Sequence, residues 1–260
     1  METYQKAGHE KVNGINMYYE VYGEGETPLV LIHGGGSTIQ SSFGKLIPFL
    51  AKSGKVIAVE LQAHGRTSDR DQAESFEQDA KDVTTLLSQL KITKANFLGF
   101  SNGGTTTLNI AAHHPAVVNK IIVISANYQR EGLIEGFYNG FGDATIDHMP
   151  EALKTAFLAV NPDKQALQTM FEKDKQRMLD FMDLSDDDLS GITCDTLLMV
   201  ADRDVIRPEH VVKMSKLITN AQLAILPGIH GTMIGEIIFP DVDSKTLEVT
   251  AYLIETFLNK

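Results

Sequence analysis

Cysteine and basic residues are both in short supply in this 260-residue chain. Cys194 is its one cysteine, which excludes an intramolecular disulfide framework and a cluster of thiolate metal ligands. Lysine and arginine number 23 against 34 aspartate and glutamate residues, giving a formal net charge of −11. Because binding to a phosphate backbone depends on Lys and Arg, this balance argues against a nucleic-acid partner.

Long apolar runs are also missing. No run approaches the roughly 18 apolar residues of a membrane-spanning helix, so no membrane association is predicted. Residues 1–6 show no basic region followed by an apolar stretch, the pattern of a secretory signal, and we therefore expect a cytoplasmic protein. A chain of this length buries roughly 70–75% of the surface that its unfolded form exposes, which is enough to fold without covalent or metal cross-links.

Short apolar segments alternate with longer amphipathic ones along most of the chain. Asn13-Gly14 is a strong turn signal, so residues 8–12 and 15–22 are predicted to form a β-hairpin. A continuous apolar run at 29–32 is typical of a strand buried on both faces of a sheet, and further strands are predicted at 56–59, 96–100, 121–124, 196–200 and 222–226, the last three of them buried. Helical spacing predicts helices over 42–53, 76–90, 105–114 and 247–258. The alternation predicts an α/β fold: a mostly parallel eight-stranded sheet with helices on both faces and the hairpin as an antiparallel edge.

Residues 129–190 are the exception to this alternation. They contain no buried strand; glycines interrupt the first part, and residues 150–159 and 163–184 are predicted helices. The charge run Asp186-Asp187-Asp188 is expected in a loop or a helix cap. We predict a helical cap inserted between two core segments, 1–128 and 191–260. Because ligands of open α/β sheets bind beyond the carboxyl ends of the strands, this cap would roof a ligand pocket.

A Gly-x-Ser-x-Gly motif at residues 99–103 lies between a predicted strand and a predicted helix. A sharp turn there needs residues without side chains two positions before and two positions after Ser101. Such a turn holds the serine hydroxyl exposed above the sheet in strained geometry. The following helix directs its N-terminal N–H groups and its positive dipole end toward the same place. Ser101 is therefore the candidate nucleophile.

Nucleophilic serine catalysis also needs a base, an acid that orients the base, and donors for the oxyanion. Asp204 and His230 follow the last two predicted strands and complete the chain order Ser, Asp, His that accompanies this motif. Asp202 competes with Asp204 but lies nearer to its strand, where a structural hydrogen bond is its expected role. Residues 33–36, His-Gly-Gly-Gly, offer backbone N–H groups suited to an oxyanion hole.

Five features in this order resemble those of the alpha/beta hydrolase superfamily, in its form with a helical cap. Residues 33–36 resemble the family's HGxx oxyanion motif, residues 64–69 its GHGxSD loop, and residues 99–104 its nucleophile elbow. Residues 201–204 resemble its GDxD motif, whose second aspartate is the triad acid, and His230 matches the base. The resemblance covers nearly the whole chain and implies the alpha/beta hydrolase fold.

The resemblance also implies a division of labour. Ser101 attacks the substrate carbonyl, His230 takes and returns the proton, and Asp204 fixes the imidazole tautomer. The N–H group of Asn102 is one oxyanion donor, and the second is expected from Gly35.

Several neighbours of these residues are expected to border the substrate. Phe100 stands beside the serine, where the family more often has histidine, and Asn102 stands where methionine is more usual. We expect Phe100, Gly34 and Gly36 to contact substrate, and Gly34 and Gly36 are also alternatives for the second oxyanion donor. His33 and His64 are expected to hold loops through hydrogen bonds.

The predicted reaction is hydrolysis of a small or medium carboxylic ester, or a related acyl substrate, through an acyl-serine intermediate. Carbon–carbon bond hydrolases, lactonases and peptidases share the fold and stay as alternatives, as does a ligand receptor that retains the triad. The expected partner is a small molecule. No cofactor is predicted, and no metal either, although Asp147 and His148 form one candidate pair in the cap. Nothing in the sequence indicates an oligomeric state.

Overall fold

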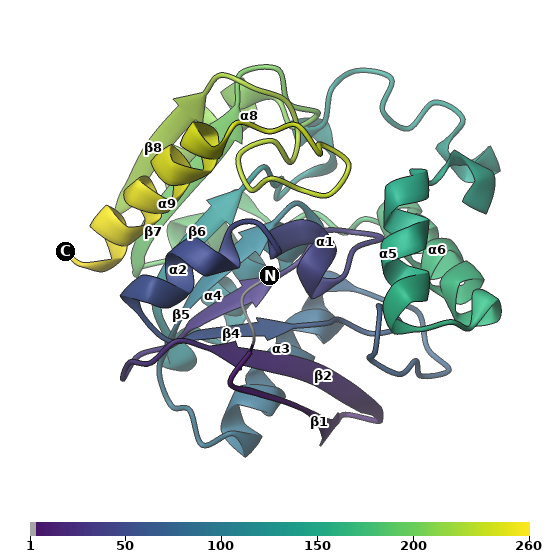
Figure 1. Ribbon diagram of the computed structural model, residues 1–260. Helices are drawn as coiled ribbons and strands as arrows, with labels where there is room; N and C mark the ends of the chain where they lie inside the picture. The colour runs from purple at the N-terminus through teal and green to yellow at the C-terminus, as the bar shows by residue number, and fades with distance from the viewer. Residues whose placement is uncertain (1–3) are drawn as a thin grey trace.

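The computed structural model describes residues 4–260 and contains an eight-stranded sheet in the order β1-β2-β4-β3-β5-β6-β7-β8 (Figure 1). β1 pairs antiparallel with β2 and β2 antiparallel with β4, whereas the later pairings are parallel. The strands are β1 (Lys6–Val12), β2 (Ile15–Tyr22), β3 (Leu29–Ile32), β4 (Val56–Val59), β5 (Ala95–Phe100), β6 (Val118–Ile124), β7 (Asp195–Ala201) and β8 (Ala221–Leu226). The predicted sheet is confirmed. The prediction that residues 1–6 carry no secretory signal falls partly on residues 1–3, which lie outside the described range.

Burial of the strands follows their position in the sheet. β3, β4 and β5 bury every residue, which explains their continuous apolar runs, because helices cover both faces. The prediction that residues 222–226 form a buried strand is wrong: Leu223 is 37% exposed and Ile225 43% exposed. β8 is the last strand in the order and pairs only with β7, so it meets solvent along its free side.

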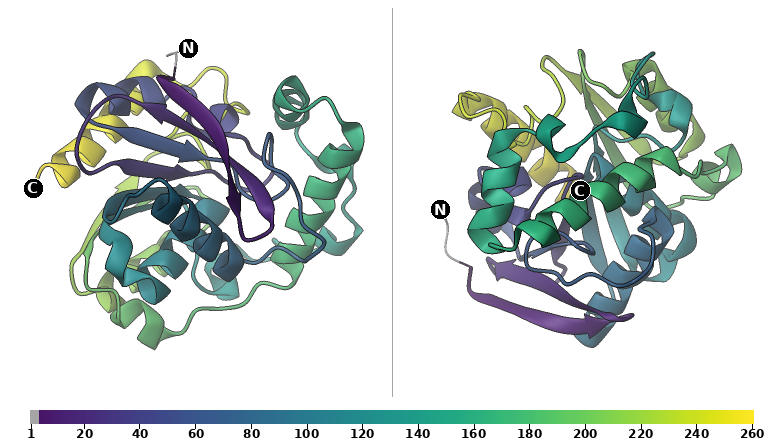
Figure 2. Two further views of the ribbon diagram at one scale, coloured as in Figure 1. Left: turned by 90° about the horizontal axis from the view of Figure 1, so that it is seen from below. Right: turned by 90° about the vertical axis from the view of Figure 1, so that its right-hand side faces the viewer.

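Helices cover the two faces of the sheet in separate layers (Figures 1 and 2). α1 (Ile39–Phe43), α2 (Ile47–Ser53) and α9 (Ser244–Leu258) pack on one face, and α3 (Phe76–Gln89), α4 (Asn102–His113) and α8 (Pro208–Leu217) pack on the other. Each layer forms its own hydrophobic core with the side chains of the sheet.

Two helix predictions for the layers beside the sheet need correction. The single helix predicted over 42–53 is two helices, because Pro48 stands in the first turn of α2, where its missing N–H makes a new start. The helix predicted from residue 105 begins at Asn102, so two glycines of weak helix propensity form its first turn. Packing of the elbow therefore outweighs local propensity here.

The segment between β6 and β7 holds α5 (Glu151–Val160), α6 (Lys164–Leu179) and α7 (Asp186–Ser190), preceded by short 3-10 turns. The helix predicted over 163–184 ends at Leu179, and the acidic run at 186–188 forms the first turn of α7, capped by Ser185. α5 and α6 stand to one side of the sheet in Figure 1 and face the viewer in the right-hand view of Figure 2. The exact division into core and cap stays a prediction.

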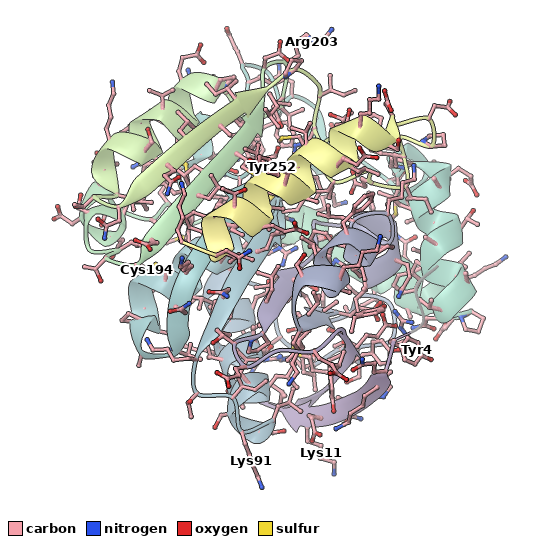
Figure 3. The ribbon with its side chains drawn as sticks, turned by 60° about the vertical axis from the view of Figure 1, so that its left-hand side comes forward. Tyr4, Lys11, Lys91, Cys194, Arg203 and Tyr252 are labelled. Carbon is pink, nitrogen blue, oxygen red and sulfur yellow. The ribbon has the colours of Figure 1, made fainter. Side chains whose placement is uncertain are left out.

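Large apolar side chains exposed on the surface include Leu223 and Ile225 of β8 and Val249 and Tyr252 of α9. Figure 3 shows Tyr252 of α9 and Arg203, after β7, directed away from the ribbon. Cys194 is partly buried just before β7, and burial raises the pKa of its thiol. Within residues 4–260, no helix combines the length and the apolar character needed to cross a membrane.

Candidate active site

The elbow around Ser101 has the geometry of a sharp strand-to-helix turn. Ser101 follows β5 directly, has φ of 54° and ψ of −123°, and precedes the first residue of α4. A Cβ atom added to Gly99 would lie 2.0 Å from the carbonyl oxygen of Gly103, and one added to Gly103 would lie 2.1 Å from that of Ile32. Neither position therefore accepts a side chain, and the strained backbone of Ser101 is held from both sides.

Ser101, His230 and Asp204 form one hydrogen-bonded chain. Ser101 Oγ lies 3.1 Å from His230 Nε2, and His230 Nδ1 lies 2.7 Å from Asp204 Oδ1. Burial alone would raise the pKa of Asp204, but the hydrogen bond and charge of His230 outweigh it and hold this pKa below its ordinary value. Asp204 therefore stays ionised and fixes the tautomer in which Nε2 is free to accept the serine proton.

Asp202, the competing acid, lies outside this chain. Its side chain is half exposed, and its Oδ1 accepts the N–H of Gly228 at 2.8 Å. This bond fixes the turn that leads toward His230, so Asp202 has a structural contact and Asp204 faces the imidazole.

Ser125 is a member of the site that the sequence did not reveal. It follows β6, has a φ of 52° and donates from Oγ to Asp204 Oδ2 at 2.6 Å. Ile206 N–H donates to the other oxygen, at 3.1 Å. A polar residue directly after a buried parallel strand is the signal that could have identified Ser125, because the carboxyl ends of such strands meet at one edge.

The glycine loop after β3 lies against the elbow. A Cβ added to Gly34 would lie 3.0 Å from the ring of Phe100, and one added to Gly35 would lie 2.6 Å from Asn102 Nδ2. Gly34 N–H faces Ser42 Oγ at 3.4 Å, and Gly36 N–H donates to Asp174 Oδ2.

These bonds leave Gly35 as the glycine whose N–H has no acceptor among the described residues. Asn102, as the first residue of α4, has no intrahelical acceptor either. The two N–H groups expected in the oxyanion hole are therefore both available.

His33 orients the peptide that carries the Gly35 N–H. Its Nδ1–H donates to the carbonyl oxygen of Gly34 at 2.7 Å, and its Nε2 accepts the N–H of Leu61 at 3.0 Å. Because a peptide unit is planar, fixing the carbonyl of Gly34 also fixes the N–H of Gly35 in the same unit. Burial lowers the pKa of His33 to about 3, so it acts as a neutral tether.

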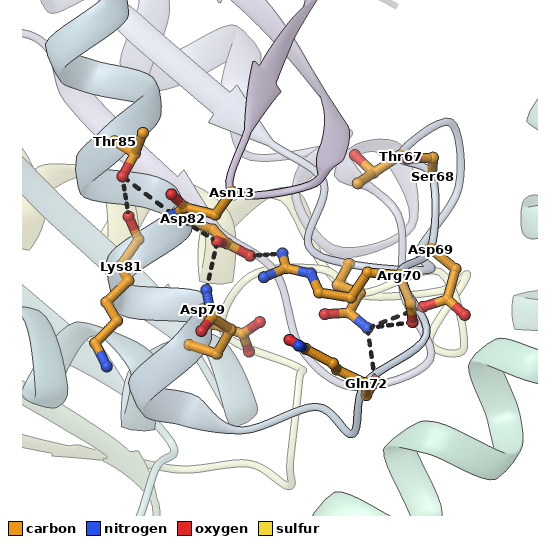
Figure 4. A network of polar contacts seen from close by, with 12 residues as sticks. Asn13, Thr67, Ser68, Asp69, Arg70, Gln72, Asp79, Lys81, Asp82 and Thr85 are labelled. Carbon is orange, nitrogen blue, oxygen red and sulfur yellow. Dashed lines mark hydrogen bonds and ion pairs between the residues drawn. The ribbon is translucent and has the colours of Figure 1, made fainter.

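His64 carries a positive charge in a buried position. Its Nδ1 lies 2.7 Å from the carbonyl oxygen of Gln62 and its Nε2 lies 3.0 Å from Asp174 Oδ2, so both ring nitrogens face acceptors. Burial would lower the pKa of His64, but the charge of Asp174 outweighs it and raises this pKa to about 9. The loop that carries His64 is anchored to α3 through the Arg70–Asp82 ion pair (Figure 4).

A cavity of about 580 Å³ opens above Ser101. It lies between the strand ends and the segment before β7, and its lining is mainly apolar and aromatic. The large apolar side chains in the lining include Phe137, Phe141, Met149, Met170, Phe171 and Met178. Besides Ser101 and His230, the polar side chains are Asn102, Asn127, Asn139, His148, Asp174 and Lys175. Gly35 and Gly36 also line it.

Two residues expected to contact substrate lie outside the lining. Phe100 is 1% exposed and packs into the core on the α2 and α9 face, with its ring centroid 4.8 Å from that of His230. As the last residue of a strand it points to the sheet face, so it supports His230 from below instead of facing the cavity. Gly34 is covered by the Phe100 ring.

The candidate metal pair Asp147 and His148 is not assembled into a site. His148 Nδ1 lies 3.1 Å from the N–H of Thr145 and closes the turn in which it stands. Across residues 4–260, no three His, Cys, Asp or Glu side chains converge in a way that would hold a metal ion.

Sequence comparison agrees with this fold. The sequence profile of the alpha/beta hydrolase fold matches residues 27–145. Serine hydrolase BPHL from Homo sapiens is 34% identical over 138 residues, which are 52% of this chain and 47% of BPHL. The chain thus spans about half the length of the first curated relatives that it matches.

Solved structures resemble the chain over nearly its full length. A meta-cleavage product hydrolase from Pseudomonas fluorescens IP01 aligns with a TM-score of 0.79 over 98% of both chains, at 22% identity. The enol-lactonase from Burkholderia xenovorans LB400 aligns with a TM-score of 0.74 over 97% of this chain and 100% of the lactonase, also at 22% identity. The chain therefore has the alpha/beta hydrolase fold.

Proposed function

We propose that this protein is a serine hydrolase that cleaves small or medium carboxylic esters through an acyl-serine intermediate. The observation that carries the proposal is the continuous hydrogen-bonded chain from Ser101 through His230 to Asp204. It supplies the nucleophile, the base and the orienting acid, and the open N–H groups of Gly35 and Asn102 supply the place for an oxyanion.

In the acylation step, a bond forms between Ser101 Oγ and the substrate carbonyl carbon while the hydroxyl proton passes to His230 Nε2. The carbonyl electron pair moves onto oxygen, and the N–H groups of Gly35 and Asn102 stabilise the resulting oxyanion. Collapse of this intermediate breaks the ester C–O bond, and the leaving alkoxide takes the proton from His230. Water then repeats the sequence on the acyl-serine and releases the acid.

The cavity supports apolar substrates of limited size. Its volume of about 580 Å³ lies within the roughly 300–1,000 Å³ range of small-molecule pockets, and aromatic and methionine side chains dominate its lining. An acyl or alcohol group of medium length and apolar character suits these walls better than a charged one.

A fluorophosphonate probe tests the nucleophile. Ser101 Oγ would form a bond to phosphorus with loss of fluoride, so intact-protein mass should rise by one adduct, and peptide mapping should place it on Ser101. The Ser101→Ala variant should stay unlabelled. The same preparations, given p-nitrophenyl esters of increasing acyl length, should show steady turnover only in the wild type. A folded wild-type protein with neither adduct nor turnover would refute the proposal, whereas one burst without turnover would favour the receptor alternative.

A further inference from the structure

Asp174 of α6 reaches from the cap segment to the glycine loop of the oxyanion hole. Its Oδ2 accepts the N–H of Gly36 and lies 3.0 Å from His64 Nε2. A Cβ atom added to Gly35 would lie 3.2 Å from the same oxygen, so the carboxylate lies directly against the expected oxyanion donor. No other contact of the described residues ties this loop to the cap by a charged group.

The bond to Gly36 matters because the loop is made of residues without side chains. Consecutive glycines have wide conformational freedom, and Gly36 itself has a φ of +66°. His33 fixes the peptide unit before Gly35 by its bond to the Gly34 carbonyl oxygen. Asp174 fixes the peptide unit after Gly35 by its bond to the Gly36 N–H. Gly35 is thus held between two bonds, one from the core and one from the cap.

A bare carboxylate in this position would oppose a developing oxyanion. Arg177 donates from Nη2 to Asp174 Oδ1 and from Nη1 to Asp79 Oδ2, and protonated His64 contacts Asp174 Oδ2, so two cations face two carboxylates in this buried cluster. Although burial favours its neutral form, Arg177 and His64 hold the pKa of Asp174 well below its usual range. Asp174 therefore serves as a fixed acceptor whose field at the hole is neutralised.

We infer that Asp174 is a positioning residue of the oxyanion hole: through Gly36 it holds the Gly35 N–H in place for the reaction. This inference rests on the proposed function. It also makes the hole depend on the docking of α6, because the acceptor reaches the loop only when this helix is seated.

The simpler reading is that Asp174 only fastens the cap. Lys173 gives a matched control for that reading, since it is the neighbouring residue on α6. Its Nζ donates to Asp69 Oδ1 at 2.7 Å and to the carbonyl oxygens of Arg70 and Gln72 at 2.6 and 2.8 Å (the three acceptor residues are labelled in Figure 4). Lys173 thus fastens α6 to the loop that carries His64, which Asp174 also contacts, but Lys173 does not contact the glycine loop.

The test compares three variants of the full chain with the wild type. Asp174→Asn keeps an oxygen acceptor and loses the charge, Asp174→Glu keeps the charge and displaces the oxygen, and Lys173→Met loosens the cap alone. Each is checked for a cooperative thermal transition. The readouts are kcat and KM for a p-nitrophenyl ester and Ki for a trifluoromethyl ketone, which adds Ser101 Oγ and leaves an oxyanion in the hole.

Both Asp174 variants should lower kcat by about 10- to 100-fold, with KM within about twofold, and should raise the ketone Ki by a similar factor. Lys173→Met should change each quantity by less than about threefold. Hydrogen exchange of the peptide containing Gly36 should speed up in the Asp174 variants, and the two variants guard against one failing to fold.

Rates and Ki values equal to wild type in both Asp174 variants, or equal losses in Lys173→Met, would overturn the role of Asp174 and leave the hydrolase proposal standing. A wild-type protein without labelling or turnover would overturn the hydrolase proposal, and the role of Asp174 with it. The two failures are therefore distinguishable.

Discussion

Gly103 offers the sharpest test of how the elbow is built. A Cβ atom at this position would lie 2.1 Å from Ile32 O and 2.5 Å from His33 O, whereas ordinary contact begins at 3.4 Å. Both neighbours are backbone atoms at the end of β3, so Gly103→Ala must push the start of α4 away from the sheet by about 1 Å. Overpacking of this kind costs about 1–3 kcal/mol of unfolding free energy. Since α4 carries Ser101 and Asn102 at its start, a displacement of about 1 Å should also lower kcat by about 100-fold.

The control for this prediction is Gly142→Ala, because a Cβ atom at Gly142 has no atom within 4 Å. Urea unfolding gives the change in stability, and ester turnover together with the rate of fluorophosphonate labelling gives the change in reactivity. Gly142→Ala should match the wild type in all three. If Gly103→Ala also kept the wild-type labelling rate, the close approach of α4 to β3 would not be what positions Ser101, and the reasoning would be wrong.

Two further predictions concern buried polar groups. Ser125→Ala removes the 2.6 Å bond to Asp204 Oδ2, so it should lower the unfolding free energy by about 1–3 kcal/mol and also lower kcat/KM. Urea unfolding and ester turnover measure the two effects. The control is Thr106→Val, which removes a buried hydroxyl with no partner among the described residues and should leave both the unfolding free energy and kcat/KM unchanged. Burial raises the pKa of Glu74 to about 8. Its carboxyl group faces the side chains of Arg177, Asp174, His64 and Asp79. Between its ordinary pKa near 4.5 and this raised value, the folded state therefore keeps a proton that the unfolded state releases. Stability should therefore fall as pH rises from about 5 to 8, by on the order of a few kcal/mol, and thermal unfolding of Glu74→Gln should show a flatter pH profile; an unchanged slope would contradict this assignment.

The sheet was predictable because its pattern is local. Runs such as 29–32 and 56–59 are continuous and apolar, and the structure gives them the same bounds. The wrong predictions concern segments whose structure depends on a packing partner from elsewhere in the chain. The segment 222–226 is apolar after Gln222, yet it forms the edge strand, and its sequence does not show that it pairs with only one other strand. The start of α4 is set by the packing of two glycines against β3, which outweighs their poor helix propensity.

Ser101, Asp204 and His230 were identifiable as candidates for a related reason: each lies in the loop that follows a strand, at one edge of the parallel part of the sheet. Asp174 was not, because its partners lie on loops more than 100 residues away and depend on how α6 docks. Its helix nevertheless carries a signal. The buried stripe of α6 begins with Leu167 and Met170 and continues at the same spacing with Asp174 and Arg177. Charges on a buried stripe are costly unless they are paired across an interface, so such a pair on a predicted cap helix indicates where the cap meets the core.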